Sequence, residues 1–255
     1  MQELNEFRHF CKWLADESGK IIKHYWRTDI NVENKPDQSP VTIADKKTEE
    51  FMREAIMKKF PNHGILGEEF GEYNPNAEYK WVLDPIDGTK SFICGAVTFG
   101  TLIALLKNGV PILGVINQPI LNEFLIGDNQ TAELNGNRVK VRNCNNLSGA
   151  VLLSSDHLTF GQYRNQEGFE KLIRKIKLYR MWGDCYGYYL VATGYADIMI
   201  DPIMNPWDLM ALIPIIRGAG GTITDYYGDD PLKGNSIVAT GGKIHNEVIE
   251  ILNNH

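Results

Sequence analysis

The chain has 255 residues, of which 43% are hydrophobic and 23% are charged, and its formal net charge is −6. This length and apolar content argue against disorder and allow one large core or two closely joined ones. An acidic chain without a dense run of Lys or Arg does not favour direct binding to nucleic acid or to an anionic membrane. We therefore expect one compact unit over residues 1–255, with an acidic surplus that suits a cation-binding site.

The N-terminal segment and the cysteines indicate a compartment. Residues 1–6 lack the basic start and apolar core of a signal peptide, and the longest uncharged apolar segment, residues 95–106, is too short to span a bilayer. The four cysteines show no CxxC spacing and are interpreted as reduced thiols, not as zinc ligands or disulfides: Cys11, Cys94, Cys144 and Cys185. These features predict a cytoplasmic protein.

Two amphipathic helices are expected near the start of the chain. Apolar residues recur at helical spacing over residues 3–26 and again over residues 42–60. Between them, residues 31–39 are polar and contain Pro36, which predicts a mobile loop. Both helices are expected to cover a sheet.

The next segment predicts a strand followed by a short helix. Residues 81–83 continue an apolar strand, and Pro85 disfavours the helical region for Asp84, so Asp84 should lie at the strand's end. Thr89 can then open a helix over residues 90–94. This order predicts a corner at which a sheet gives way to a helix N-terminus.

The remainder predicts further strands and helices. Residues 99–141 alternate β-rich runs with Asn-Gly-type turns, which predicts an antiparallel meander. Beyond it the pattern predicts two strands and three helices: residues 150–154, 237–239, 187–193, 206–217 and 243–253. The fold class is therefore α+β, with approximate halves 1–145 and 146–255.

The string from Asp84 to Thr89, Asp-Pro-Ile-Asp-Gly-Thr, is the main candidate for a functional site. Asp84 and Asp87 can face the same divalent ions if the backbone between them curls, and Ile86 can add its carbonyl oxygen. Oxygen ligands favour Mg²⁺ or Mn²⁺ over zinc. Gly88 permits unusual backbone angles, and the helix that Thr89 opens presents free N–H groups to an anion such as phosphate. The alternative is that the aspartates only cap a strand-to-helix corner.

Four more acidic residues are candidates for this site. Glu68 and Glu69 follow an apolar strand, and because adjacent residues of an extended chain point to opposite sides, at most one can face a metal squarely. The alternative is a pair of solvated glutamates. Asp45 and Asp208 fall in the first turns of helices, where a carboxylate can merely complement the helix dipole.

In this order, Glu68, the Asp84–Thr89 string and the Trp207-Asp208 pair resemble the inositol monophosphatase superfamily of Mg²⁺-dependent phosphatases. The segments 41–45 and 218–221 are similar to that family too, so the resemblance covers most of the chain. It implies a five-layered αβαβα sandwich that assembles as a homodimer. It also implies hydrolysis of a small phosphorylated alcohol.

The resemblance assigns the metal ligands. Glu68, Asp84 and the Ile86 carbonyl would hold one Mg²⁺, and Asp84, Asp87 and Asp208 would hold a second. Glu68 would thereby also serve catalysis, since such ions neutralise phosphate oxygens and lower the pKa of bound water. The implied mechanism is direct in-line attack of metal-activated water. A haloacid dehalogenase-type phosphoenzyme, which uses an Asp-x-Asp-Gly-Thr string, is disfavoured because two residues separate Asp84 from Asp87.

The remaining assignments concern catalysis and phosphate binding. Asp45 would pair with the Thr89 hydroxyl near the attacking water, and could reach a third, weaker ion through solvent. The backbone N–H groups of Gly88 and Thr89 would cradle the phosphate.

Other segments of the sequence indicate which phosphorylated alcohol is the substrate. Residues 183–192, 90–93 and 99–105 look most like the branch that hydrolyses L-histidinol phosphate, and Asp184 could pair with the substrate's ammonium group. The alternative is that Asp184 caps a helix. Asp201 lies where the family lines its alcohol pocket, at a position that is Glu in inositol-selective members. Myo-inositol 1-phosphate is the second candidate, because a carboxylate also accepts hydroxyl hydrogen bonds.

Two other readings are less favoured. A sugar or nucleotide bisphosphate needs a basic cluster for its second phosphate, and the sequence shows none in place. Some bacterial relatives of this fold bind the transcription machinery, so a bifunctional or regulatory protein is the alternative from another functional class.

Overall fold

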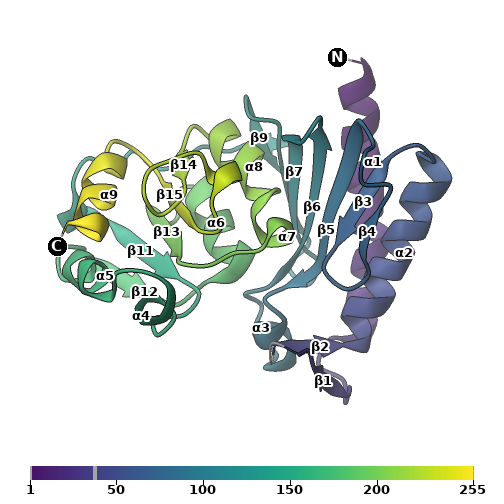
Figure 1. Ribbon diagram of the computed structural model, residues 1–255, viewed down its shortest axis with the longest axis horizontal. Coiled ribbons are helices and arrows are strands. Elements are labelled where there is room, and N and C mark those ends of the chain that lie inside the picture. Colours follow the sequence, from purple (N-terminus) through teal and green to yellow (C-terminus); the bar gives the residue numbers. More distant parts are fainter. Residues whose placement is uncertain (1, 37–38, 255) are drawn as a thin grey trace.

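The computed structural model describes residues 2–36 and 39–254, and its elements stack as helices, sheet, helices, sheet and helices (Figure 1). The first layer holds α1 (Gln2–Tyr25) and α2 (Ile43–Lys59). Their apolar faces pack on the first sheet through buried side chains such as Leu14 and Met52. Both helices match the predicted spans to within one residue at each end.

The second layer is an eight-stranded sheet in the order β10-β9-β8-β7-β6-β5-β3-β4. The strands from β6 to β10 each pair antiparallel with the next, which confirms the predicted meander. The strand β3 instead pairs parallel with β5. The strand bounds are β3 (Gly64–Gly67), β4 (Gly71–Tyr73), β5 (Tyr79–Asp87), β6 (Gly100–Lys107), β7 (Val110–Gln118), β8 (Glu123–Gly127), β9 (Ala132–Leu134) and β10 (Asn137–Arg138).

The central layer holds three helices: α6 (Asp184–Ala192), α7 (Pro206–Leu209) and α8 (Leu212–Gly218). The predicted single helix over residues 206–217 is divided into α7 and α8. Pro214 has no N–H, so it cannot donate to the carbonyl of Met210 where the break lies. Helix α8 lies close to β7, and a Cβ added at Gly114 would overlap the Ala211 carbonyl oxygen.

The fourth layer is a five-stranded sheet in the order β12-β11-β13-β15-β14. Its bounds are β11 (Val151–Ser154), β12 (Leu178–Arg180), β13 (Ile198–Asp201), β14 (Thr222–Thr224) and β15 (Ile237–Thr240). The outer layer contains α4 (Phe160–Tyr163), α5 (Gln166–Ile173) and α9 (His245–Asn253), and it packs on this sheet around Phe169 and Val248. The α+β class and the αβαβα layering are as expected.

Smaller elements complete the chain. The predicted loop over residues 31–39 contains β1 (Val32–Asn34), which pairs antiparallel with β2 (Pro40–Thr42). Residues 37 and 38 of that loop lie outside the described residues. The short helix α3 (Thr89–Ile93) ends one residue before the predicted limit, and two 3-10 turns occupy Leu147–Gly149 and Pro231–Lys233. Among the described residues, no helix has the length and apolar character needed to cross a membrane.

Candidate active site

The strand β5 does not end at Asp84, as the sequence suggested, but continues to Asp87 across a bulge. Asp84 faces Leu102 and Asp87 faces Gly100, so an extra residue is inserted between them. Pro85 needs no ladder partner at such a bulge because it has no N–H. The Asp84 carboxylate accepts the Ile86 N–H at 3.0 Å. The bulge is the curl that brings the two carboxylates together.

Asp208 joins this pair from α7, which contacts β5. Its side chain accepts the N–H of Asn205 at 2.8 Å in a capping box, so the helix N-terminus fixes its orientation. Ligand oxygens of Asp84, Asp87 and Asp208 all lie within 4.8 Å of one another. An oxygen-only set of this kind fits a hard divalent cation such as Mg²⁺ or Mn²⁺.

The electrostatics of the cluster also indicate a cation site. Burial raises the pKa of Asp84 and of Asp87 well above the ordinary value, and the negative charges of neighbouring carboxylates raise both further. Burial likewise raises the pKa of Asp208 to about 7, with Glu68 and Asp201 adding to the rise. Ionised carboxylates so close together repel one another, and a bound cation would relieve this repulsion.

Glu68 lies beside this cluster because β3 and β5 pair in parallel, with Gly67 opposite Leu83. The Lys35 ammonium group is 2.7 Å from Glu68 Oε1 and 2.7 Å from Glu69 Oε1. The expectation that the two glutamates point to opposite sides is wrong, because the strand ends at Gly67 and the next residues form a turn. A lysine thus neutralises part of the acidic site.

Asp45 and Thr89 meet at the N-termini of α2 and α3. The Thr89 hydroxyl is 3.3 Å from Asp45 Oδ1 and 3.0 Å from the Ile86 carbonyl oxygen. Asp45 Oδ2 accepts both the N–H and the hydroxyl of Thr42, which completes a capping box. Asp45 therefore caps its helix and contacts Thr89 at the same time. A structural role at the helix N-terminus and a role in the site are compatible for this residue.

The start of α6 closes over the same corner. Gly88 has a left-handed backbone with φ of 87°, and a Cβ added there would lie 2.9 Å from Asp184 Oδ2. The N–H of Cys185 donates to Asp87 Oδ2. Asp184 is the first residue of α6 and Gly183 occupies the cap position, so Asp184 is not the N-cap. Asp184 itself has a φ of 53°, a left-handed backbone conformation that costs free energy outside glycine. Such a conformation persists only where the surrounding structure holds it in place.

Asp201 ends β13 next to α6 and is 5% exposed. It accepts the Tyr188 hydroxyl at 2.8 Å and the Ser155 N–H at 3.2 Å. The Ser155 hydroxyl also accepts the Asp184 N–H at 2.8 Å. Ser155 therefore links the Asp201 carboxylate to the backbone of Asp184, the two residues that the sequence suggested for the alcohol pocket.

Comparison with known proteins identifies the family. The family model described as "Inositol monophosphatase family" matches residues 3–255. The chain belongs to the inositol monophosphatase family. It is similar to the bifunctional phosphatase IMPL2, chloroplastic, of Arabidopsis thaliana, at 43% identity over 99% of this chain and 77% of that protein. It is also similar to a histidinol-phosphatase of Chlorobaculum parvum, at 37% identity over 94% of each chain.

Comparison with solved structures supports the same family. An inositol monophosphatase from Zymomonas mobilis superposes with a TM-score of 0.87, at 34% identity over 97% of this chain and 98% of that one. The five-layered sandwich is therefore the inositol monophosphatase fold. The protein is a phosphoric monoester hydrolase, as are the members of this family, which use divalent metal ions.

Contacts of four residues at this phosphatase site were missed in the sequence. Lys35 was counted only as part of a polar loop, and its ion pairs with Glu68 and Glu69 have no local signal in the sequence. Ser155 and the Cys185 N–H carried no signal at all, because their contacts join segments that are far apart in the chain. Glu49, which binds the turn after Glu68, was likewise unassigned.

Proposed function

We propose that this family member hydrolyses L-histidinol phosphate, with two or three Mg²⁺ ions as cofactor and Mn²⁺ as a substitute. The observation that carries the proposal is the position of Asp184, whose carboxylate lies over Gly88 at the expected phosphate site. Burial and the negative charge of Asp201 raise the pKa of Asp184 to about 7. An ammonium group on the substrate would stabilise the ionised carboxylate, and an uncharged polyol would not. The similarity to a histidinol-phosphatase supports the same choice.

The metal ligands in this proposal are five residues: Glu68, Asp84, Asp87, Asp208 and, through its carbonyl, Ile86. Three of these already form a compact oxygen cluster, and Glu68 lies beside it. When bound, the ions neutralise phosphate oxygens and lower the pKa of water. The protein's own contribution is to hold these oxygens in a buried, rigid frame that requires little reorganisation during the reaction.

The other proposed roles are positioning and proton transfer. The Thr89 hydroxyl and Asp45 orient a water molecule, and Asp45 is suited to take its proton because burial raises the pKa of this carboxylate. The backbone N–H groups of Gly88 and Thr89 bind the phosphate. The water oxygen forms a bond to phosphorus as the bond from phosphorus to the alcohol oxygen breaks, and the departing alkoxide takes up a proton from solvent, so no phosphoenzyme forms. An acyl-phosphate trapped on Asp84 with labelled substrate would refute this route.

Myo-inositol 1-phosphate is the second candidate substrate. Asp201 already accepts a tyrosine hydroxyl, which is the kind of contact that an inositol hydroxyl would make. The similarity to an inositol monophosphatase also supports this candidate.

Phosphate release from three substrates tests the proposal: histidinol phosphate, myo-inositol 1-phosphate and fructose 1,6-bisphosphate, each with and without Mg²⁺. We expect Mg²⁺-dependent release that is fastest for histidinol phosphate and is lost in Asp87→Asn. Hydrolysis of none of the three would favour the regulatory reading, in which the protein binds the transcription machinery.

We also propose that the protein forms a homodimer, as the family resemblance implies. Met181 and Trp182 are 58% and 47% exposed, which leaves apolar surface available for a second copy. Light scattering that gives the mass of a single chain would refute this.

A further inference from the structure

Glu49 is a fully buried carboxylate in the middle of α2, one turn after Asp45. Its Oε2 atom accepts the N–H of Glu69 at 2.7 Å, and its Oε1 atom accepts the N–H of Phe70 at 3.1 Å. These two amides form the turn that directly follows Glu68. One side chain therefore holds the backbone on the C-terminal side of a proposed metal ligand.

The Glu49 carboxylate also packs closely against Gly67, the residue before Glu68. A Cβ added at Gly67 would overlap Glu49 Oε1, although the backbone of Gly67 is not left-handed. The glycine is thus required by the nearby carboxylate and not by its own backbone angles. Positions 67, 69 and 70 all contact Glu49, so the backbone of Glu68 is fixed from both sides.

Arg53 completes this support. Its NH1 group lies 3.3 Å from Glu49 Oε1 and donates to the Gly71 carbonyl at 2.8 Å. A buried carboxylate is costly unless its charge is paired and its oxygens are hydrogen-bonded. Here an arginine and two amides satisfy both requirements. The pair therefore extends the fixed segment from Gly67 to Gly71.

We propose that Glu49 is a positioning residue for the metal site, acting through Glu68; this rests on the proposed role of Glu68 as a metal ligand. Glu49 contacts the backbone of the turn, and so it sets where the Glu68 carboxylate stands relative to Asp84 on the neighbouring strand. Asp45 on the same helix contacts Thr89, so α2 positions two parts of the site. Loss of Glu49 should loosen one metal ligand and leave the others in place.

The substitution Glu49→Gln tests this directly. Glutamine keeps one acceptor oxygen and turns an NH₂ group toward the other amide, so one of the two bonds to the turn is lost. We expect the dissociation constant for Mn²⁺, measured by electron paramagnetic resonance titration, to rise at least about tenfold, roughly 1.4 kcal/mol. At saturating Mg²⁺ the kcat should return to within about threefold of the unsubstituted protein, because the chemistry is unchanged.

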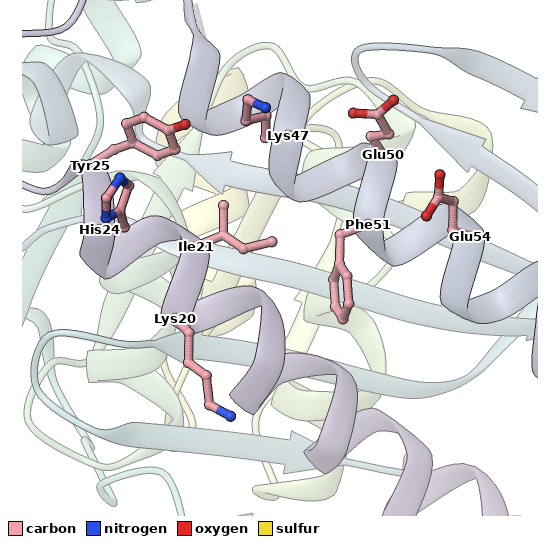
Figure 2. Close-up of a pocket in the computed structure, with 8 residues that line it drawn as sticks. All are labelled: Lys20, Ile21, His24, Tyr25, Lys47, Glu50, Phe51 and Glu54. Atoms are coloured by element: carbon pink, nitrogen blue, oxygen red, sulfur yellow. The ribbon is translucent and has the colours of Figure 1, made fainter.

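Matched controls come from the solvent-exposed side of the same helix. A groove of about 570 Å³ runs between α1 and α2, and Figure 2 shows Glu50 and Glu54 of α2 on its rim. The groove is lined by Lys20, Ile21, His24, Tyr25, Lys47, Glu50, Phe51 and Glu54. None of these residues belongs to the acidic site. Glu50→Gln and Glu54→Gln remove the same charge from α2 and should leave Mn²⁺ binding unchanged.

Two further variants make the outcome decisive. Glu68→Gln should weaken Mn²⁺ binding; if it does not, the proposed ligand role of Glu68 fails and the inference fails with it. If Glu68→Gln weakens binding but Glu49→Gln does not, the inference about Glu49 alone is overturned. Gly67→Ala disturbs the same contact from the other side and should also raise the Mn²⁺ dissociation constant. It decides the question if Glu49→Gln does not fold, and unchanged binding there would contradict the proposal.

Discussion

Asp184 and Gly88 lie in direct apposition: a Cβ on Gly88 would be 2.9 Å from Asp184 Oδ2. The two residues are nearly a hundred positions apart, and the absence of a Cβ on Gly88 leaves room for the carboxylate. In the proposed function this contact places a negative charge next to the phosphate, where a cationic substrate group can meet it.

Asp184→Asn should therefore reduce activity toward a cationic substrate more than toward a neutral one. A lost charge-assisted hydrogen bond costs about 1.5 to 3 kcal/mol, so kcat/KM for histidinol phosphate should fall roughly ten- to a hundredfold. For myo-inositol 1-phosphate the change should stay within about threefold. Steady-state kinetics with both substrates measures this, and equal losses for the two would mean that Asp184 does not recognise the amine.

Asp208→Asn should stabilise the metal-free protein and weaken its metal binding. The pKa of Asp208 is raised to about 7, so the folded state binds a proton that the unfolded state has already released, and stability falls as pH rises from about 4 to 7. The amide avoids this cost and can still accept the Asn205 N–H. At pH 8 without metal we expect a gain on the order of 1 to 3 kcal/mol in urea denaturation. Added Mg²⁺ should stabilise the unsubstituted protein more than the variant. A metal-free variant that is less stable would contradict the account.

His245 should make the protein sensitive to acid. Burial lowers the pKa of His245 to about 4, and its ring nitrogens lie 3.0 Å from the hydroxyls of Thr224 and Thr240. The unfolded state binds the proton first, so stability is complete above the ordinary histidine pKa near 6.5 and is lost as pH falls toward 4. Between pH 7 and 4.5 the unsubstituted protein should lose on the order of 2 kcal/mol more than His245→Gln. Parallel losses in the two proteins would exclude this role for His245.

Lithium should inhibit the enzyme, as the family resemblance implies for the metal position formed by Asp87 and Asp208. Li⁺ is a small, hard cation that oxygen ligands accept, but it carries half the charge of Mg²⁺. We expect millimolar LiCl to slow Mg²⁺-dependent phosphate release while the same concentration of KCl does not. Unaffected rates in LiCl would count against this carry-over from the family.

The parts of the fold that follow a simple period were predictable from the sequence. The helices over residues 3–26 and 42–60 have a helical apolar spacing, and the meander over residues 99–141 has turn residues between its strands. The strand β13 was missed although β15, which is also buried along its whole length, was predicted, because a short apolar run without alternation does not by itself distinguish a strand from a helix segment. The strands β12 and β14 and the helix α5 were missed as well.

The site was predictable to the extent that its residues are grouped in the sequence. Asp84 and Asp87 were found because they share one string, yet the bulge that joins them depends on pairing with β6. The contacts of Lys35 with Glu68 and of Glu49 with the following turn arise only when distant segments pack together. No local pattern encodes them.

One competition measurement tests the central claim most directly. Equal concentrations of histidinol phosphate and myo-inositol 1-phosphate are mixed with the Mg²⁺-loaded protein, and ³¹P NMR follows the disappearance of both. The ratio of the two rates gives the ratio of kcat/KM. We expect histidinol phosphate to be consumed at least about ten times faster, a difference of roughly 1.4 kcal/mol between the two transition states. Equal rates, or faster loss of the inositol ester, would contradict the proposed substrate.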